Sequence, residues 1–161
     1  MSASRAPGPV AAGDQPERSF DLAPVALDED ACFLLLESRE LGRIAFTVKG
    51  LPVILPVNYA IEGRIIVFRT GPGTKLDLVP RTAVAFEVDS WESALGTGWS
   101  VMARGLAEDV TSNPGRTAAH LRRAKVNPVA PGERSHWLAI KPAEITGRRF
   151  SVPPQSDQTR R

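Results

Sequence analysis

The sequence predicts a mainly β protein, a small six-stranded antiparallel barrel with short flanking helices. Two observations support this prediction: apolar and β-branched residues recur in short runs, and glycine-containing turns separate those runs. The expected strands are residues 43–48, 52–61, 64–70, 82–88, 98–110 and 137–150. Six short strands joined by hairpin turns, together with two or three short helices, fit a small antiparallel barrel.

A chain of 161 residues is long enough for one domain with one hydrophobic core. We expect this domain to span residues 23–150. Residues 1–22 are rich in proline, glycine, alanine and serine and show no sustained apolar period, which predicts a disordered segment. Residues 151–161 have the same character and are expected to form a flexible tail.

Charge and composition argue against several classes of protein. The formal net charge is only +2 and aromatic residues make up 6% of the chain, too little of either to predict nucleic-acid binding. No apolar run approaches the roughly 18 residues that span a bilayer, and the N-terminus lacks the continuous apolar stretch of a signal peptide. Cys32 is the only cysteine, which excludes an intramolecular disulfide and favours a reducing, cytoplasmic location. Its apolar surroundings predict core packing rather than a nucleophile.

An α-helix is expected after the disordered segment. Asp28 can cap the first free N–H groups, and the acidic residues that follow suit the positive end of the helix dipole. Apolar residues continue through Leu36, and Gly42 lies just past the predicted end. This helix should cover one mouth of the barrel. Residues 113–125 also have helical character, and residues 76–79 suggest a single helical turn.

Glycine and proline mark the turns and irregularities of the expected strands. Two-residue turns containing glycine favour hairpins, glycine within a strand favours a bulge, and proline removes a donor from the ladder. The expected features are hairpin turns at Lys49-Gly50 and Glu62-Gly63, a bulge or bend at Gly105, and an interruption of the last strand at Lys141-Pro142.

The most informative segment is the glycine-rich turn that follows the third expected strand. It reads Gly71-Pro72-Gly73-Thr74-Lys75. Two glycines let backbone N–H groups approach an anion, Lys75 adds positive charge, and Thr70 and Thr74 add hydroxyl donors. Its spacing and residue order differ from those of a P-loop. The segment therefore predicts either a phosphate-binding turn or an ordinary strand–helix turn with a solvated lysine.

Arg69 stands inside an apolar strand and needs a partner there. By alternation it shares a face with Val67, whereas Thr70 points to the other face. Its partner is expected to be either an anion or a carboxylate such as Glu87 or Asp89 on a neighbouring strand.

The second strand and the tryptophans offer further candidates for ligand contact. Pro52 and Pro56 each remove a ladder donor, which implies an edge, a bulge or exposure to a ligand. Asn58 is expected either to hydrogen-bond the polar edge of a ring or to form a turn. Trp99 follows glycines that let the backbone approach a ligand, and a place in the barrel core is the equal alternative.

No catalytic or metal-binding cluster is evident in the sequence. His120 and His136 are isolated, no spacing joins them to Cys32 as metal ligands, and no serine lies on a nucleophile elbow. The basic residues between 116 and 125 are interpreted as a solvated helix face.

Six segments follow one another in a characteristic order: GRIAF, LPVILPVNY, IVFRTGPGTK, VAFEVD, GWSVMARGLAEDV and HWLAIKPAEITGRRF. In this order, which covers residues 27–150, the chain resembles the pyridoxamine 5′-phosphate oxidase-like, FMN-binding split-barrel family. Small actinobacterial members and nitroimidazole-resistance type proteins are the most similar. The resemblance implies a six-stranded antiparallel split β-barrel that forms a homodimer, with FMN in clefts at the subunit interface.

The resemblance also implies which residues hold the cofactor. Two of them, Lys75 and Thr70, would hold the FMN phosphate, with Arg69 and Thr74 nearby. The others would surround the isoalloxazine: Pro56, Val57 and Asn58 along it, Gly98, Trp99 and Ser100 from the later strand, and Trp137 closing the site.

Two functions follow from the resemblance. The first is an FMN-dependent oxidoreductase that acts on a small planar molecule, with no side chain required as an acid or a base. Oxidation of pyridoxamine phosphate itself is not expected, because only Gly147-Arg148-Arg149 echoes a second phosphate site. The alternative is a non-catalytic carrier or sensor that binds a flavin, the deazaflavin F420 or haem, although no proximal histidine for haem is evident.

Overall fold

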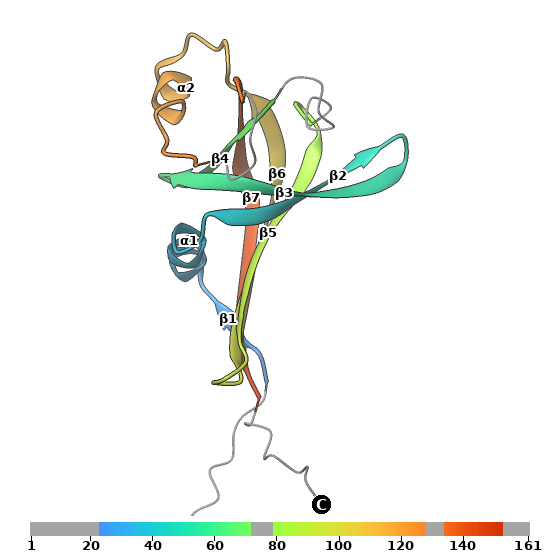
Figure 1. The fold of residues 1–161 in the computed structure, drawn as a ribbon, viewed down its shortest axis with the longest axis vertical. Helices are drawn as coiled ribbons and strands as arrows, with labels where there is room; N and C mark the ends of the chain where they lie inside the picture. The colour runs from blue at the N-terminus through green and yellow to red at the C-terminus, as the bar shows by residue number, and fades with distance from the viewer. Residues whose placement is uncertain (1–22, 72–78, 128–133, 153–161) are drawn as a thin grey trace, which may run out of the picture.

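The computed structural model of the protein describes residues 23–71, 79–127 and 134–152. Strands dominate this part of the chain, as the sequence predicts, and they form a closed ring of antiparallel pairings (Figure 1). The elements are β1 (Val25–Leu27), α1 (Glu29–Glu37), β2 (Leu41–Val48), β3 (Leu51–Glu62), β4 (Ile65–Thr70), β5 (Ala83–Glu92), β6 (Thr97–Asp109), α2 (Arg116–Leu121) and β7 (His136–Ser151). The six predicted strands correspond to β2 through β7, and β1 is an additional short strand. Within the described residues, no helix is long and apolar enough to cross a membrane.

Closure of the barrel depends on β7, whose 16 residues pair with strands on both edges. The sheet order is β1-β7-β4-β3-β2-β5-β6, and a further pairing of β6 with β7 closes the ring. On one edge β7 pairs with β4 through residues 136–140 and with β1 through residues 147–149. On the other edge it pairs with β6 through residues 138–151. β7 therefore runs from the end of the barrel beside α2 to the opposite end beside β1 (Figure 1).

The two hairpins on either side of β3 use tight turns, as predicted. Lys49 and Gly50 both have positive φ, 50° and 81°, which is the backbone of a type I′ turn. The next hairpin turns through Gly63 and Arg64, one residue later than predicted, because Glu62 still pairs within β3.

α1 begins where the sequence predicts, with the carboxylate of Asp28 accepting a hydrogen bond from the N–H of Ala31 at 2.8 Å. The helix ends at Glu37, and Gly42 is not its terminator. Gly42 lies in β2, where a Cβ atom would stand 2.4 Å from Cζ of Phe86. The glycine is therefore explained by the close approach of an aromatic ring in the core rather than by the end of a helix.

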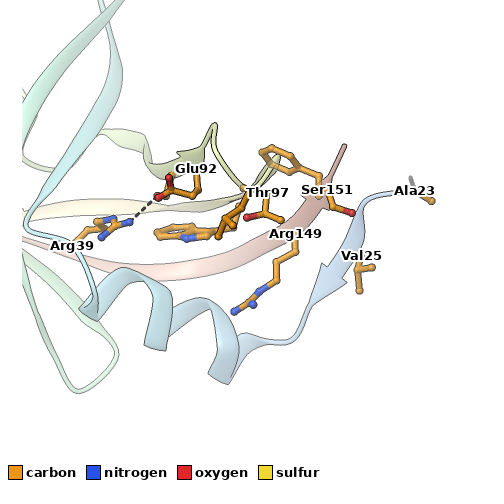
Figure 2. Close-up of a pocket in the computed structure, with 12 residues that line it drawn as sticks. Ala23, Val25, Arg39, Glu92, Thr97, Arg149 and Ser151 are labelled. Atoms are coloured by element: carbon orange, nitrogen blue, oxygen red, sulfur yellow. Dashed lines mark hydrogen bonds between the residues drawn. The ribbon is translucent and has the colours of Figure 1, made fainter. Parts of the chain in front are cut away.

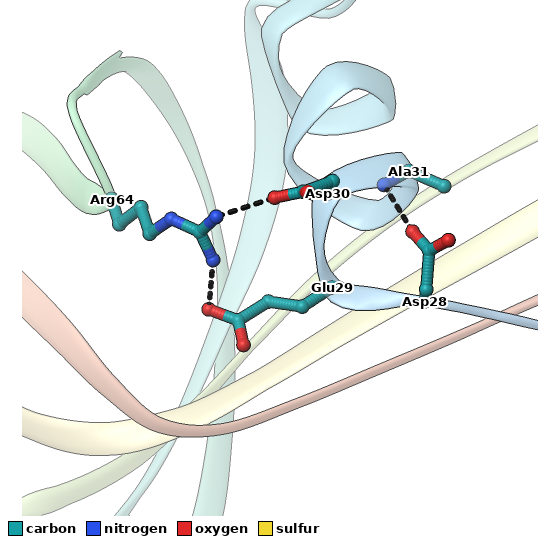
Figure 3. A network of polar contacts seen from close by, with 5 residues as sticks. All are labelled: Asp28, Glu29, Asp30, Ala31 and Arg64. Atoms are coloured by element: carbon teal, nitrogen blue, oxygen red, sulfur yellow. Dashed lines mark hydrogen bonds and ion pairs between the residues drawn. The ribbon is translucent and has the colours of Figure 1, made fainter.

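An arginine joins the start of α1 to the turn between β3 and β4 (Figure 3). Arg64 forms ion pairs with Glu29 and Asp30, and its guanidinium carbon lies 5.3 Å from the ring centre of Phe33. The three charged side chains are more than half exposed. Such exposed ion pairs contribute little stability, so their main effect is to orient the helix.

β6 and β7 contain one irregularity, at the place where glycine predicts it. The pairing register shifts between Arg104 and Gly105, where β7 carries one extra residue. A Cβ atom on residue 105 would stand 2.5 Å from the carbonyl oxygen of Lys141, which glycine avoids. β7 continues as a strand through Lys141-Pro142, so the predicted interruption is a bulge and not a break.

α2 is shorter than the predicted helical segment 113–125. The side-chain oxygen of Asn113 accepts a hydrogen bond from the N–H of Gly115 at 2.9 Å, which forms a turn before the helix starts. The helix ends at Leu121 and is capped by Arg122, whose guanidinium donates a hydrogen bond to the carbonyl oxygen of Asn113 at 2.9 Å. Arg122 therefore braces this segment and is not merely part of a solvated basic face.

The buried apolar side chains form two clusters, on opposite sides of the barrel wall. The larger cluster fills the barrel and the space beneath α1, and Cys32 is fully buried in it, as the sequence predicts. Its fully buried members include Leu36, Ile44, Ile66, Phe68, Phe86, Val101, Leu138 and Ile140. The smaller cluster packs α2 against β4 and β7 through Val67, Val110, Ala118, Leu121, Ala124, Val126 and Ala139.

Tyr59, the single tyrosine of the chain, links the barrel to α1. Its hydroxyl donates a hydrogen bond to the carbonyl oxygen of Leu36 at 2.6 Å, and its ring meets Phe86 edge to face at 4.9 Å. Burial raises the pKa of Tyr59 well above its ordinary value, and the positive charge of Arg39 opposes this only in part.

We expect the phenol of the native protein to remain protonated well above about pH 10, where a free tyrosine ionises. Because the folded-state pKa is raised, the stability that Tyr59 contributes is complete below about pH 10 and is lost as the pH rises further. The ultraviolet absorbance of phenolate measures this directly, since one tyrosine alone produces it, and Tyr59→Phe supplies the blank. Ionisation near pH 10 in protein that is still folded would contradict the prediction.

Candidate functional site

Two arginines and a tryptophan meet where β4 ends, at the α2 end of the barrel. Arg69 on β4 pairs with Trp137 on β7, and its guanidinium carbon lies 4.9 Å from the centre of the indole ring. Nε of Arg69 donates a hydrogen bond to the carbonyl oxygen of Arg134 at 2.9 Å. The structure therefore brings two of the predicted cofactor-binding residues, Arg69 and Trp137, into contact.

Neither carboxylate suggested from the sequence is the partner of Arg69. Glu87 and Asp89 instead form ion pairs with Arg43, at 3.3 and 2.8 Å. β5 lies between β2 and β6 in the sheet and is not a neighbour of β4, so its side chains do not reach Arg69. Within the described residues, Arg69 has a carbonyl group and an aromatic ring as partners but no counter-charge.

Arg134 is a candidate that sequence reasoning missed. Its Nε is buried and has no hydrogen-bond partner within the described part of the chain. A buried donor without a partner costs about 1–3 kcal/mol, and more when the group is charged. Arg134 and Arg69 together therefore favour a negatively charged ligand. No local pattern marks Arg134, because it stands alone in a polar segment before β7.

Thr70 follows Arg69 at the end of β4 but points into the barrel. It is only 1% exposed, and its hydroxyl donates a hydrogen bond to the carbonyl oxygen of Gly71 at 3.3 Å. Thr74 and Lys75 lie in the segment 72–78, outside the described residues, as does most of the helical turn predicted over 76–79. The roles predicted for Thr70, Thr74 and Lys75 stay predictions.

The three predicted residues of β3 do not share one face. Val57 is buried in the barrel, whereas Pro56 is exposed and Asn58 is half-buried. Pro56 pairs with Arg43 of β2, and the amide of Asn58 donates a hydrogen bond to the carbonyl oxygen of Glu40 at 3.1 Å. Pro56 and Asn58 thus border the outer face of the barrel, and Val57 belongs to its core.

The outer face beside them carries a line of charged and polar side chains on β2, β5 and β6. Arg43 bridges Glu87 and Asp89, and Asp89 pairs across the sheet with Ser100. Burial and the nearby charge of Asp89 raise the pKa of Glu87, while Arg43 opposes both effects. A cleft of about 510 Å³ lies on this face, lined by Glu87, Ser100, Val101, Met102, Thr146, Gly147 and Arg148.

The predicted trio of β6 is divided between the two faces as well. Gly98 and Ser100 alternate with Trp99, which faces inward and packs against the barrel core. A Cβ atom on residue 98 would stand 2.6 Å from the ring of Phe150, so the glycine makes room for an aromatic side chain of the same chain. Trp99 lines a separate pocket at this end of the barrel.

The predicted residues therefore form groups at opposite ends of the barrel. Arg69 and Trp137 lie at the α2 end, whereas Gly98 pairs with Phe150 near β1 (Figure 1). Trp137 and Phe150 are 13 residues apart on β7, which corresponds to roughly 40 Å of strand. One cofactor molecule held by a single protomer does not touch both groups.

The described residues contain no group of three or more histidine, cysteine, aspartate or glutamate side chains that could hold a metal ion. Cys32 lies on the buried face of α1, and burial raises the pKa of its thiol, with the charges of Asp28 and Glu29 adding to the effect. A protonated, enclosed thiol suits core packing.

The fold defines a small split-barrel protein, and the arginine pair gives it a positively charged candidate site at the end of β4. Comparison with known proteins makes this assignment specific. The chain belongs to the pyridoxamine 5′-phosphate oxidase family, whose model matches residues 28–149. The resemblance observed in the sequence is thereby confirmed.

Relatives of similar size support this membership. The chain is 36% identical over 133 residues to the uncharacterised protein Rv0080 of Mycobacterium tuberculosis, covering 78% of this chain and 85% of that protein. A Mycobacterium smegmatis structure described as an FAD-binding protein is 35% identical with a TM-score of 0.68, covering 81% of this chain and 99% of that one. A Corynebacterium glutamicum protein, provisionally described as a pyridoxamine 5′-phosphate oxidase, is 27% identical with a TM-score of 0.69, covering 84% and 99%.

Proposed function

We propose that the protein is a flavin-dependent oxidoreductase acting on a small planar molecule, with FMN, the cofactor that the family resemblance implies. The observation that carries the proposal is the cationic end of β4, where Arg69 contacts Arg134 and the buried Nε of Arg134 lacks a partner within the described residues. A phosphate group offers the missing negative charge and binds guanidinium groups through charge-assisted hydrogen bonds. The related Mycobacterium smegmatis protein described as FAD-binding supports a flavin nucleotide.

The residues at this strand end fit the phosphate of such a cofactor. Lys75 and Thr74 follow β4 closely in the sequence and are proposed to add an ammonium group and a hydroxyl donor to the arginine pair. Trp137 places an aromatic surface beside Arg69. When bound, a flavin supplies hydride or electron transfer, and the protein contributes binding, orientation and exclusion of water.

The proposal extends to a homodimer, because the predicted residues lie at opposite ends of one protomer. In a dimer, the face of one protomer that carries Ser100 would meet the β4 end of the other. That outer face has apolar side chains that are 39–64% exposed: Leu41, Ile54, Met102 and Leu106. A second copy that covers them would form an interface above roughly 1,200 Å², and the lone cysteine favours a cytoplasmic location for the assembly.

Reduction of an uncharged acceptor is proposed rather than oxidation of pyridoxamine phosphate. The residues that partly match a second phosphate site in the sequence are Arg148 and Arg149. These neighbours on β7 point to opposite faces of the strand. Arg148 donates a weak hydrogen bond to Ser100 on the outer face at 3.5 Å, whereas Arg149 pairs with inward-facing Trp99. The two guanidinium groups therefore do not hold one phosphate together.

Cofactor and assembly are tested on the purified protein. We expect the absorbance of an oxidised flavin, and mass spectrometry of the released cofactor distinguishes FMN from FAD and F420. Light scattering should give about twice the 17.4 kDa chain mass. Loss of one charge-assisted bond in Lys75→Ala should weaken flavin binding about 10- to 100-fold. A protein that binds no flavin at micromolar concentration would overturn the cofactor proposal, and a species of single-chain mass would overturn the dimer.

The reaction is tested by two assays on the flavin-loaded protein. Reduced protein should be reoxidised without oxygen by quinones or nitroaromatics, and pyridoxamine phosphate should not be turned over under oxygen. Fast formation of pyridoxal phosphate would overturn the proposed substrate class. Failure of both reactions with flavin still bound would support the alternative of a carrier or sensor, and a Soret band would indicate haem.

A further inference from the structure

A pocket of about 550 Å³ lies at the β1 end of the barrel (Figure 2). Arg69 lies at the opposite end, where it pairs with Trp137. One row of paired residues lines it, with Ser90 on β5, Trp99 on β6, Arg149 on β7 and Val25 on β1. Arg39, from the segment between α1 and β2, reaches into the same pocket. Its volume lies in the range of pockets that hold small organic ligands.

Positive charge in this pocket is not balanced within the described residues. Arg39 donates a hydrogen bond to Oγ of Ser90 at 2.7 Å, which is a neutral partner. Arg149 forms no ion pair or side-chain hydrogen bond in the described part of the chain. Glu92 is the one carboxylate among the lining residues, and it pairs with neither arginine. Two guanidinium groups and one carboxylate favour an anionic ligand.

An aromatic surface accompanies the two charges. The guanidinium carbon of Arg39 lies 5.7 Å from the ring centre of Trp99, and the indole is only partly buried. A planar ring can stack on an indole while an attached anionic group meets nearby guanidinium groups. Thr97 and Ser151, which pair with each other in the next row, add hydroxyl donors to the lining.

We propose that this pocket binds a planar aromatic anion, with its ring on Trp99 and its carboxylate or phosphate between Arg39 and Arg149. An aryl carboxylate and a nucleotide share this chemistry. The site does not depend on the proposed flavin function, because Trp99 faces inward while Ser100 faces outward, and because Arg69 on β4 pairs with Trp137 at the other end of β7.

Calorimetric titration of the protein as purified, with 2-naphthoate and with adenosine monophosphate, tests the proposal. We expect one site per protomer for at least one probe, and the tighter probe distinguishes an aryl carboxylate from a nucleotide. Arg149→Gln should weaken that probe about tenfold, as expected for the loss of one charge-assisted bond. Trp99→Leu should weaken it by about tenfold through lost stacking. If naphthoate is the probe, uncharged 2-naphthamide should bind about tenfold more weakly.

Arg148→Gln is the matched control, because it removes the same charge one residue away on the opposite face of β7. It should leave the affinity of the probe unchanged. Binding of neither probe, equal losses in Arg148→Gln and Arg149→Gln, or displacement of bound flavin by the probe would each overturn the proposal. Arg149 is exposed, so its replacement keeps the test valid even if Trp99→Leu fails to fold.

Discussion

Replacement of Phe86 by alanine is expected to lower the free energy of unfolding by roughly 3–5 kcal/mol. Phe86 is fully buried on β5, its ring contacts Tyr59 edge to face at 4.9 Å, and Gly42 leaves space for that ring. Alanine would leave a cavity between three strands that are held by their pairing and cannot collapse around it. Urea unfolding followed by circular dichroism measures the change.

The control for this prediction is Trp91→Ala on the same strand. Trp91 is 48% exposed and stacks on Phe150 at the end of β5, so its loss should cost clearly less than the loss of Phe86. If both variants lowered the free energy of unfolding by the same amount, the burial of Phe86 would not account for its contribution to stability. If Phe86→Ala does not fold, Phe86→Leu should show a smaller loss in the same direction.

Arg134→Gln is expected to weaken flavin binding about 10- to 100-fold, because each charge-assisted bond to a phosphate contributes roughly 1.5–3 kcal/mol. The structural reason is that Nε of Arg134 is buried without a partner within the described residues, beside Arg69. In the protein without cofactor, removal of a guanidinium whose buried Nε has no partner within the described residues should maintain or raise stability. Opposite effects on affinity and on stability distinguish a ligand-binding residue from a structural one.

Arg64→Gln provides the matched control, since it removes an equal charge from surface ion pairs with Glu29 and Asp30. Flavin titration of the protein without cofactor should give wild-type affinity for this variant. Arg69→Gln should weaken binding as Arg134→Gln does, and it should also loosen the segment before β7, because the hydrogen bond to the carbonyl oxygen of Arg134 is lost. Unchanged affinity in both β4-end variants would place the phosphate elsewhere.

Several features of this protein could be predicted from local sequence, because they depend on the backbone of a few neighbouring residues. Asp28 caps a helix, Lys49-Gly50 forms a type I′ turn and Gly105 marks a bulge, all as predicted. The alternation of apolar residues located six strands, and the order of the motifs identified the family.

The candidate site was predictable only in part. Arg69 and Trp137 do meet, because the pairing of β4 with β7 places them opposite each other. The other cofactor-binding residues were predicted from the order of the motifs along the chain. That order does not show on which face of the barrel wall each side chain lies. The pocket that Trp99 lines with Arg39 and Arg149 joins residues from distant segments, and no local pattern links them.

Only the tertiary structure decided which groups become neighbours. Strand order keeps Glu87 away from Arg69 and brings it to Arg43, and the approach of Phe86 explains Gly42. The sequence by itself determined the barrel, the helix start and the family, since these follow from periodicity and local turns. The face of the sheet on which a side chain lies, and the side chains that it contacts, depend on the register between strands that are far apart in the chain. A shift of one residue in that register would turn each side chain to the other face.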